Sequence, residues 1–168
     1  MGGMTIRPMT DGDRDAVLDL SATTFDGIAI DQQLSERSNT DLSTGWAERF
    51  TISLERHLDD SRSRTYLAVE DGGRIVGYVT VVVDTTTEVG EIPYLAVDDD
   101  HQDRGIGTRL LTYGMDELRR AGMSHATIET VAANERCREW YPTLGFKEYA
   151  RQVMYVRELN DQDETTEA

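Results

Sequence analysis

Residues 102–107 read Gln102-Asp103-Arg104-Gly105-Ile106-Gly107, and they stand between two segments of different pattern. The apolar run 92–97 before them is rich in strand-forming residues, which predicts a β-strand. After them, apolar residues recur at steps of four, one, four and three, the spacing of one face of an α-helix: Ile106, Leu110, Leu111, Met115 and Leu118. The glycines are therefore expected where a strand ends and a helix begins.

Such a turn has the chemistry of an anion site. The first N–H groups of a helix have no helical acceptor and lie at the positive end of its dipole. Glycine lets an anion approach the backbone closely, so the loop is expected to cradle a pyrophosphate. It is not a Walker A loop, because no Lys-Ser/Thr pair follows Gly107, and Leu110 stands where a dinucleotide fingerprint has its third glycine. Taken alone, the loop fits a tight turn without a ligand equally well.

Three motifs in this order resemble the GNAT superfamily of N-acetyltransferases. Gln102-x-x-Gly105-x-Gly107 is similar to the family's acyl-CoA-binding motif. Residues 128–134, Ile-Glu-Thr-Val-Ala-Ala-Asn, resemble its next strand and asparagine, and residues 140–146, Trp-Tyr-Pro-Thr-Leu-Gly-Phe, resemble its Tyr-x-x-Leu-Gly-Phe helix end. The resemblance extends from Ile75 to Leu159 and is loose over the residues before it.

The alternation of strand and helix patterns predicts a mixed α/β sheet. The resemblance implies that this central sheet is mostly antiparallel, with flanking helices and one parallel strand pair that splays apart. Strands are expected at 5–8, 65–70, 74–83, 88–97 and 126–131, helices at 10–20, 46–58, 106–121 and 134–141, and a closing hairpin at 147–158. Pro93 predicts a bulge or break in its strand because it has no N–H to donate.

The domain organisation follows from length and composition. Residues 1–159 are expected to form a single domain, because no linker or internal repeat is visible. Residues 160–168 form a polar acidic tail, whose composition predicts disorder. Residues 25–44 show little periodicity, and the resemblance implies that this region builds part of the acceptor site.

The resemblance also implies which residues bind acetyl-CoA. Main-chain groups of Leu95, Ala96 and Val97 would pair with the pantetheine arm. The N–H groups of residues 103–108 would hold the pyrophosphate. The full set implied for the co-substrate is Leu95, Ala96, Val97, Gln102, Asp103, Arg104, Gly105, Ile106, Gly107, Thr108, Asn134 and Tyr141. Two of these have alternatives, since Asn134 also suits a helix cap and Arg104 also suits bulk solvent.

Amine acetylation by a thioester needs a proton acceptor for the amine and benefits from a proton donor for the leaving thiolate. Motif position makes Tyr141 the candidate donor, and a core tyrosine packed beside Trp140 is its alternative. Glu129 resembles the base of bacterial ribosomal-protein N-terminal acetyltransferases, and Glu91 resembles the glutamate of histone-type lysine acetyltransferases. Either glutamate also suits a solvated strand position, and many family members have no single essential base. We favour Glu129, acting through a water.

The sequence leaves several functions open. The first is an acetyl-CoA-dependent N-acetyltransferase that moves the acetyl group directly to a primary amine. The second is a non-catalytic acyl-CoA sensor or scaffold, and the third is an acyltransferase that uses another acyl-CoA. Cys137 is disfavoured as a nucleophile, because the family transfers directly. His101 beside the acidic run 98–100 does not predict a metal site, because adjacent loop acids are expected to be solvated.

Charge and composition restrict the kinds of partner that the protein is expected to bind. The chain has 32 acidic and 17 basic residues, and this balance disfavours nucleic acid. No segment has the roughly 18 consecutive apolar residues of a membrane helix, and the single cysteine excludes an internal disulfide. We expect a cytoplasmic protein, either a monomer or a homodimer, with a small-molecule or peptide amine as acceptor. Abundant aspartate beside a single lysine, Lys147, resembles the proteins of salt-loving archaea.

Overall fold

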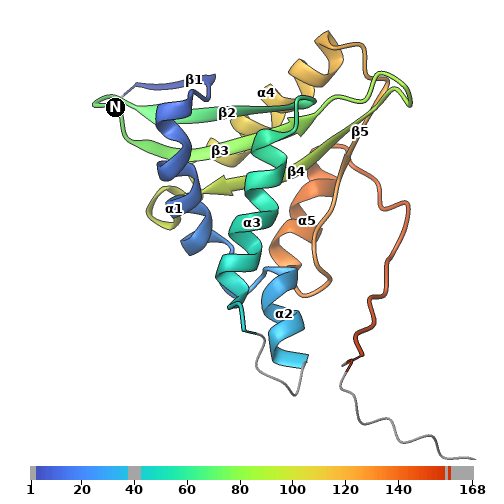
Figure 1. Cartoon of the computed structure of the whole chain (residues 1–168). Helices are drawn as coiled ribbons and strands as arrows, with labels where there is room; N and C mark the ends of the chain where they lie inside the picture. The colour runs from blue at the N-terminus through green and yellow to red at the C-terminus, as the bar shows by residue number, and fades with distance from the viewer. Residues whose placement is uncertain (1–2, 38–42, 158, 160–168) are drawn as a thin grey trace, which may run out of the picture.

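The computed structural model describes residues 3–37, 43–157 and 159, and its centre is a five-stranded sheet with helices on both faces (Figure 1). The strands follow chain order across the sheet: β1 (Met4–Pro8), β2 (Ser63–Glu70), β3 (Ile75–Val82), β4 (Val89–Val97) and β5 (His125–Ile128). Neighbours from β1 to β4 are antiparallel, whereas β4 and β5 are parallel. The expected mixed, mostly antiparallel sheet with one parallel pair is confirmed.

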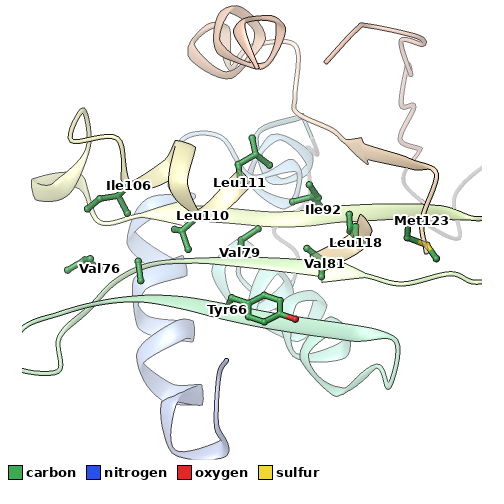
Figure 2. Close-up of a cluster of buried hydrophobic side chains, with 11 residues drawn as sticks. Tyr66, Val76, Val79, Val81, Ile92, Ile106, Leu110, Leu111, Leu118 and Met123 are labelled. Atoms are coloured by element: carbon green, nitrogen blue, oxygen red, sulfur yellow. The ribbon is translucent and has the colours of Figure 1, made fainter. Parts of the chain in front are cut away.

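Two hydrophobic clusters hold the helices to the sheet. One face carries α1 (Arg14–Thr24) and α3 (Trp46–Asp59), whose buried side chains include Val17, Phe50 and Leu54. The other face carries α4 (Ile106–Arg120). Figure 2 shows Leu110, Leu111 and Leu118 of α4 gathered with Val79 and Val81 of β3. Helix α5 (Glu135–Thr143) packs Trp140 and Tyr141 against this second cluster.

Helix α4 sits close to the sheet because one of its residues has no side chain. A Cβ at Gly114 would lie 3.1 Å from Val81 and 3.2 Å from Val79. At the far end, Gly122 has a φ of 88°, and the N–H of Met123 donates to the carbonyl of Leu118 at 3.0 Å. This is the glycine helix end that the sequence predicts, and it fixes where α4 stops.

The structure differs from the sequence-based expectation in three places. Helix α2 (Ile30–Arg37) lies in the region that shows little periodicity, and none of its residues is buried, so the apolar pattern is weak. Strand β5 ends at Ile128 instead of residue 131, because β4 diverges from it there. The closing hairpin at 147–158 is wrong for the described residues 147–157, which contain no strand. Tyr149 and Tyr155 are 83% and 93% exposed, and strand propensity without a packing face does not make a sheet.

Residues 158 and 160–168 lie outside the described part of the chain, so the expectation of a disordered tail remains a prediction. Among the described helices, none combines the length and the apolar character that crossing a membrane requires.

Candidate active site

The parallel strands β4 and β5 separate partway along β4. Residues 89–92 of β4 lie opposite residues 125–128 of β5, and the pairing ends there. Strand β4 continues to Val97 and stays paired with β3. The β3–β4 register shifts at this point, since Thr80 lies opposite Tyr94 but Val82 lies opposite Glu91. Two residues of β4, Ile92 and Pro93, thus occupy the place of one, which is the bulge that the proline predicts.

Among the described residues, this divergence leaves one edge of β4 without a strand beside it over residues 93–97. Main-chain groups of Leu95, Ala96 and Val97 lie on this part of β4. An extended ligand can add to such an edge by pairing with main-chain N–H and C=O groups. The position is therefore suited to the pantetheine arm that the sequence leads us to expect.

A turn with two left-handed residues connects β4 to α4. Asp103 has a φ of 59° and Gly105 a φ of 76°. The helical ladder of α4 opens with the N–H of Arg109, which donates to the carbonyl of Gly105 at 3.0 Å. The N–H groups of residues 106–108 precede it, as at every helix start, and are available to an anion. A Cβ at Gly105 would meet no atom within 4 Å, so the space before the turn is open.

Polar side chains tie this turn to its surroundings. The Gln102 amide donates to the carbonyl of Val97 at 3.2 Å and to the Asp99 carboxylate at 2.7 Å, so it supports the backbone of the turn. Arg136 of α5 donates to Asp103 at 2.6 Å and also to the side-chain oxygen of Gln102. Arg104 is exposed, as expected if its side chain extends into bulk solvent. The sequence motifs gave no sign of the Arg136 contacts, because Asp103 lies 33 residues away along the chain.

Asn134 caps helix α5. Its side-chain oxygen accepts a hydrogen bond from the N–H of Cys137 at 3.2 Å. The capping alternative is thus confirmed, and the contact with the pantetheine arm stays a prediction.

Tyr141 brings a half-buried phenol from α5 to this region. Its ring lies 5.5 Å from that of Trp140 and 5.9 Å from that of Phe146. Trp140 in turn borders the glycine turn, since a Cβ on Gly107 would lie 3.3 Å from the indole. Burial raises the pKa of the Tyr141 phenol well above its ordinary value, and Cys137 adds to the effect. The hydroxyl is therefore protonated at neutral pH, as a proton donor requires.

Glu91 and Glu129 lie on the same face of the two diverging strands. Ala126 and Ile128 pack against the cluster on the α4 face, whereas the charge of Glu129, just beyond β5, acts on Tyr94 of the opposite cluster. Ile92 also joins the α4-face cluster, which directs its neighbour Glu91 to the opposite face as well. Both carboxylates are exposed.

The two glutamates differ in their position along the strands. Glu91 lies opposite Thr127, inside the paired section, whereas Glu129 is the first residue beyond it. Burial raises the pKa of Tyr94, and the charges of Asp31 and Glu129 add to this shift. Glu91 instead acts on Arg62, whose pKa is raised first by its hydrogen bond to Asp60. Of the two glutamates, Glu129 is thus the one whose charge acts on Tyr94, at the point where the strands part.

Tyr94 belongs to a polar cluster on this face that the sequence patterns did not reveal. Its hydroxyl lies 3.3 Å from the Ser53 hydroxyl and 3.5 Å from Nδ1 of His57, both on α3. The Phe50 ring packs against Tyr94 at 5.9 Å, edge to face. Helical periodicity marks only the apolar residues of α3, so it carries no signal for Ser53 or His57.

The acidic run before the glycine turn is only partly solvated. Asp98 is half-buried and contacts both His101 and Arg74, so the expectation of solvated loop acids is wrong for this residue. Asp99 and Asp100 are exposed, as expected.

The chain is similar in sequence to proteins named as N-acetyltransferases. It is 32% identical to N-alpha-acetyltransferase 30 of Schizosaccharomyces pombe over 96 residues, which span 55% of this chain and 63% of that protein. It is 32% identical to the [ribosomal protein bS18]-alanine N-acetyltransferase of Salmonella typhimurium strain LT2 over 68% of this chain and 80% of that one. The chain thus covers less than two thirds of the Schizosaccharomyces pombe protein and more of the Salmonella one.

A solved structure shows the same fold. The aminoglycoside N-acetyltransferase AAC(6')-Iy in complex with CoA superposes with a TM-score of 0.68 at 16% identity, covering 94% of this chain and 96% of that one. Residues 32–146, with both diverging strands and the glycine turn, match the model of the acetyltransferase (GNAT) family. The chain therefore belongs to the GNAT family of acetyltransferases.

Proposed function

We propose that the protein is an acetyl-CoA-dependent N-acetyltransferase that moves the acetyl group directly to a primary amine in a ternary complex. The observation that carries this proposal is the parting of β4 from β5 just ahead of the glycine turn, with Tyr141 on the helix beside that turn. The free edge of Leu95, Ala96 and Val97 would hold the pantetheine arm. The N–H groups of residues 103–108 would hold the pyrophosphate, at the positive end of α4.

In this proposal Glu129 accepts a proton from the amine and Tyr141 donates a proton to the leaving thiolate. In the proposed reaction, Glu129 accepts a proton from the acceptor amine through a water, and the neutral amine attacks the thioester carbonyl. The new C–N bond forms, the C–S bond breaks, and the sulfur takes the proton of the Tyr141 hydroxyl. The nitrogen then loses its second proton to become the amide, and that proton restores the Tyr141 hydroxyl through water. Because Tyr141 is protonated at neutral pH, it is ready for this step.

The test is turnover of acetyl-CoA on a panel of amines: protein N-terminal peptides, lysine, polyamines, aminoglycosides and amino acids. Acetylation of any of them supports the proposal, and the panel identifies the acceptor. If the protein binds acetyl-CoA but acetylates none of the amines, the proposed enzyme function is contradicted, and a non-catalytic sensor or scaffold is favoured. If turnover occurs only with succinyl-CoA or propionyl-CoA, the assigned acyl donor changes, while the fold and the type of reaction stay as proposed.

Replacement of the two glutamates separates the candidate bases. We expect Glu129→Gln to lower kcat/KM for the amine about tenfold near neutral pH, less than a directly contacting base would give, because a water stands between. Glu91→Gln is its matched control, on the same face and equally exposed, and should change kcat/KM less than about twofold. Initial-rate measurements on both variants decide between them, and a larger loss in Glu91→Gln would reverse the assignment.

We further propose that the protein works in the cytoplasm of a salt-loving organism and uses its acidic surface to stay soluble there. The supporting observation is a formal net charge of −15 in 168 residues with one lysine. High salt screens the repulsion among these carboxylates, so the melting temperature should rise as KCl increases to molar concentration. Thermal unfolding in increasing KCl measures this, and a flat or falling melting temperature would contradict the proposal.

A further inference from the structure

A buried histidine lies directly before the glycine turn. His101 ends the short 3-10 helix Asp99–His101 and is 6% exposed. Its Nδ1 lies 3.1 Å from a carboxylate oxygen of Asp98, and its Nε2 lies 3.3 Å from a carboxylate oxygen of Glu70 on β2. Each ring nitrogen therefore lies beside a carboxylate oxygen, and the Nδ1 contact is a hydrogen bond.

Only a charged ring can offer an N–H to both carboxylates at once. A neutral imidazole carries one N–H and can donate to one of the two carboxylates, while its other nitrogen turns a lone pair toward the second. An imidazolium donates to both. The charged groups around the ring are Glu70 and Asp98, and Arg74 donates to the second oxygen of Asp98 at 2.8 Å.

The three partners connect the turn to the rigid sheet. Glu70 ends β2, Arg74 directly precedes β3, and Asp98 directly follows β4. The N–H of Asp98 also donates to the carbonyl of Val76 on β3 at 2.9 Å. Gln102, which opens the glycine turn, is the residue after His101. The His101 ring and these contacts thus connect the start of the turn to two strands.

We propose that His101 is a positioning residue for the acyl-CoA turn, and that loss of its proton loosens the turn and weakens acyl-CoA binding. The proposal rests on the proposed acetyl-CoA site. Its direction follows from the contacts, since raising the pH removes one of the two N–H donors and with it the link to Glu70 or Asp98. Acyl-CoA affinity should therefore be highest when the ring is charged and fall as the pH rises.

The decisive experiment is calorimetry of acetyl-CoA binding from about pH 5 to about pH 8, the range in which histidines generally lose their proton. We expect the wild-type affinity to fall about fivefold across this range. In Glu70→Gln the neutral ring can pair with the amide, so the affinity near pH 5 should stay within about twofold of wild type and its fall should largely disappear. Glu55→Gln, which removes a carboxylate from the α3 surface, should follow the wild-type curve and so account for titration of the ligand itself.

A second readout needs no ligand. The amide resonances of Gly105 and Gly107 should shift with the titration of the His101 ring in wild type and in Glu55→Gln, but not in Glu70→Gln. The role of His101 would be overturned if acetyl-CoA binding had the same pH dependence in wild type and Glu70→Gln. It would also be overturned if the glycine amide resonances did not change with the His101 ring. Either result would leave the acetyl-CoA site intact. Absence of acetyl-CoA binding at every pH in folded protein would overturn the site and this role together.

Discussion

Gly105→Glu should abolish acetyl-CoA binding while the protein stays folded. Gly105 has a left-handed backbone, and the space in front of it is open, so a glutamate there would project toward the place where the pyrophosphate is expected. A carboxylate beside a pyrophosphate costs several kcal/mol, so affinity should fall by about a hundredfold or more. Isothermal titration calorimetry in high salt on wild type and variant measures the effect.

The matched control is Gly122→Glu, at the other end of the same helix. Gly122 has a φ of 88°, and a Cβ there would also meet no atom within 4 Å, so the substitution brings the same backbone strain and the same charge. It should keep wild-type affinity for acetyl-CoA. Equal binding by Gly105→Glu and wild type would refute the proposed phosphate cradle, whereas equal losses in both variants would trace the effect to strain or charge.

Tyr141→Phe should remove most of the turnover and little of the binding. The substitution keeps the ring that packs beside Trp140 and Phe146, and it removes only the hydroxyl. Without a proton donor the thiolate must leave as an anion, so kcat should fall about a hundredfold, while KM for acetyl-CoA stays within about twofold. Steady-state kinetics at saturating amine gives both numbers.

The control for this substitution is Tyr149→Phe, at a tyrosine that is 83% exposed, and it should leave kcat unchanged. The pH profile adds a second check. Burial keeps the pKa of Tyr141 well above its ordinary value, so this group should cause no loss of activity on the alkaline side of neutral. Wild-type kcat in Tyr141→Phe would assign the tyrosine to core packing alone.

Local patterns predicted the elements whose apolar residues are buried on one side. Helix α4 shows a clear helical spacing because Leu110, Leu111 and Leu118 all face the sheet, and its end at Gly122 needs a residue that adopts a positive φ. Pro93 predicted the bulge from the missing N–H alone. These features depend on neighbours along the chain, which a single sequence contains.

Features that depend on distant partners were not predictable in this way. The extent of β5 is set by where β4 turns away, and the segment 147–157 has the composition of strands but pairs with no described strand. The contacts of Arg136 with the glycine turn and of His101 with Glu70 join residues more than 30 positions apart. Charge and propensity at one position do not reveal such pairs, so they emerge only from the fold.

The parting of β4 from β5 also has a thermodynamic consequence. A ligand that pairs with the free edge of β4 completes the sheet, and it does so only in the folded chain. Under the proposed function, acetyl-CoA at a hundred times its Kd would add about 2.7 kcal/mol to the free energy of unfolding, a large share of what a domain of this size has in total. The lifetime of the enzyme against unfolding and proteolysis would then follow the supply of its own acyl donor, and a starved cell would lose the protein together with the reaction.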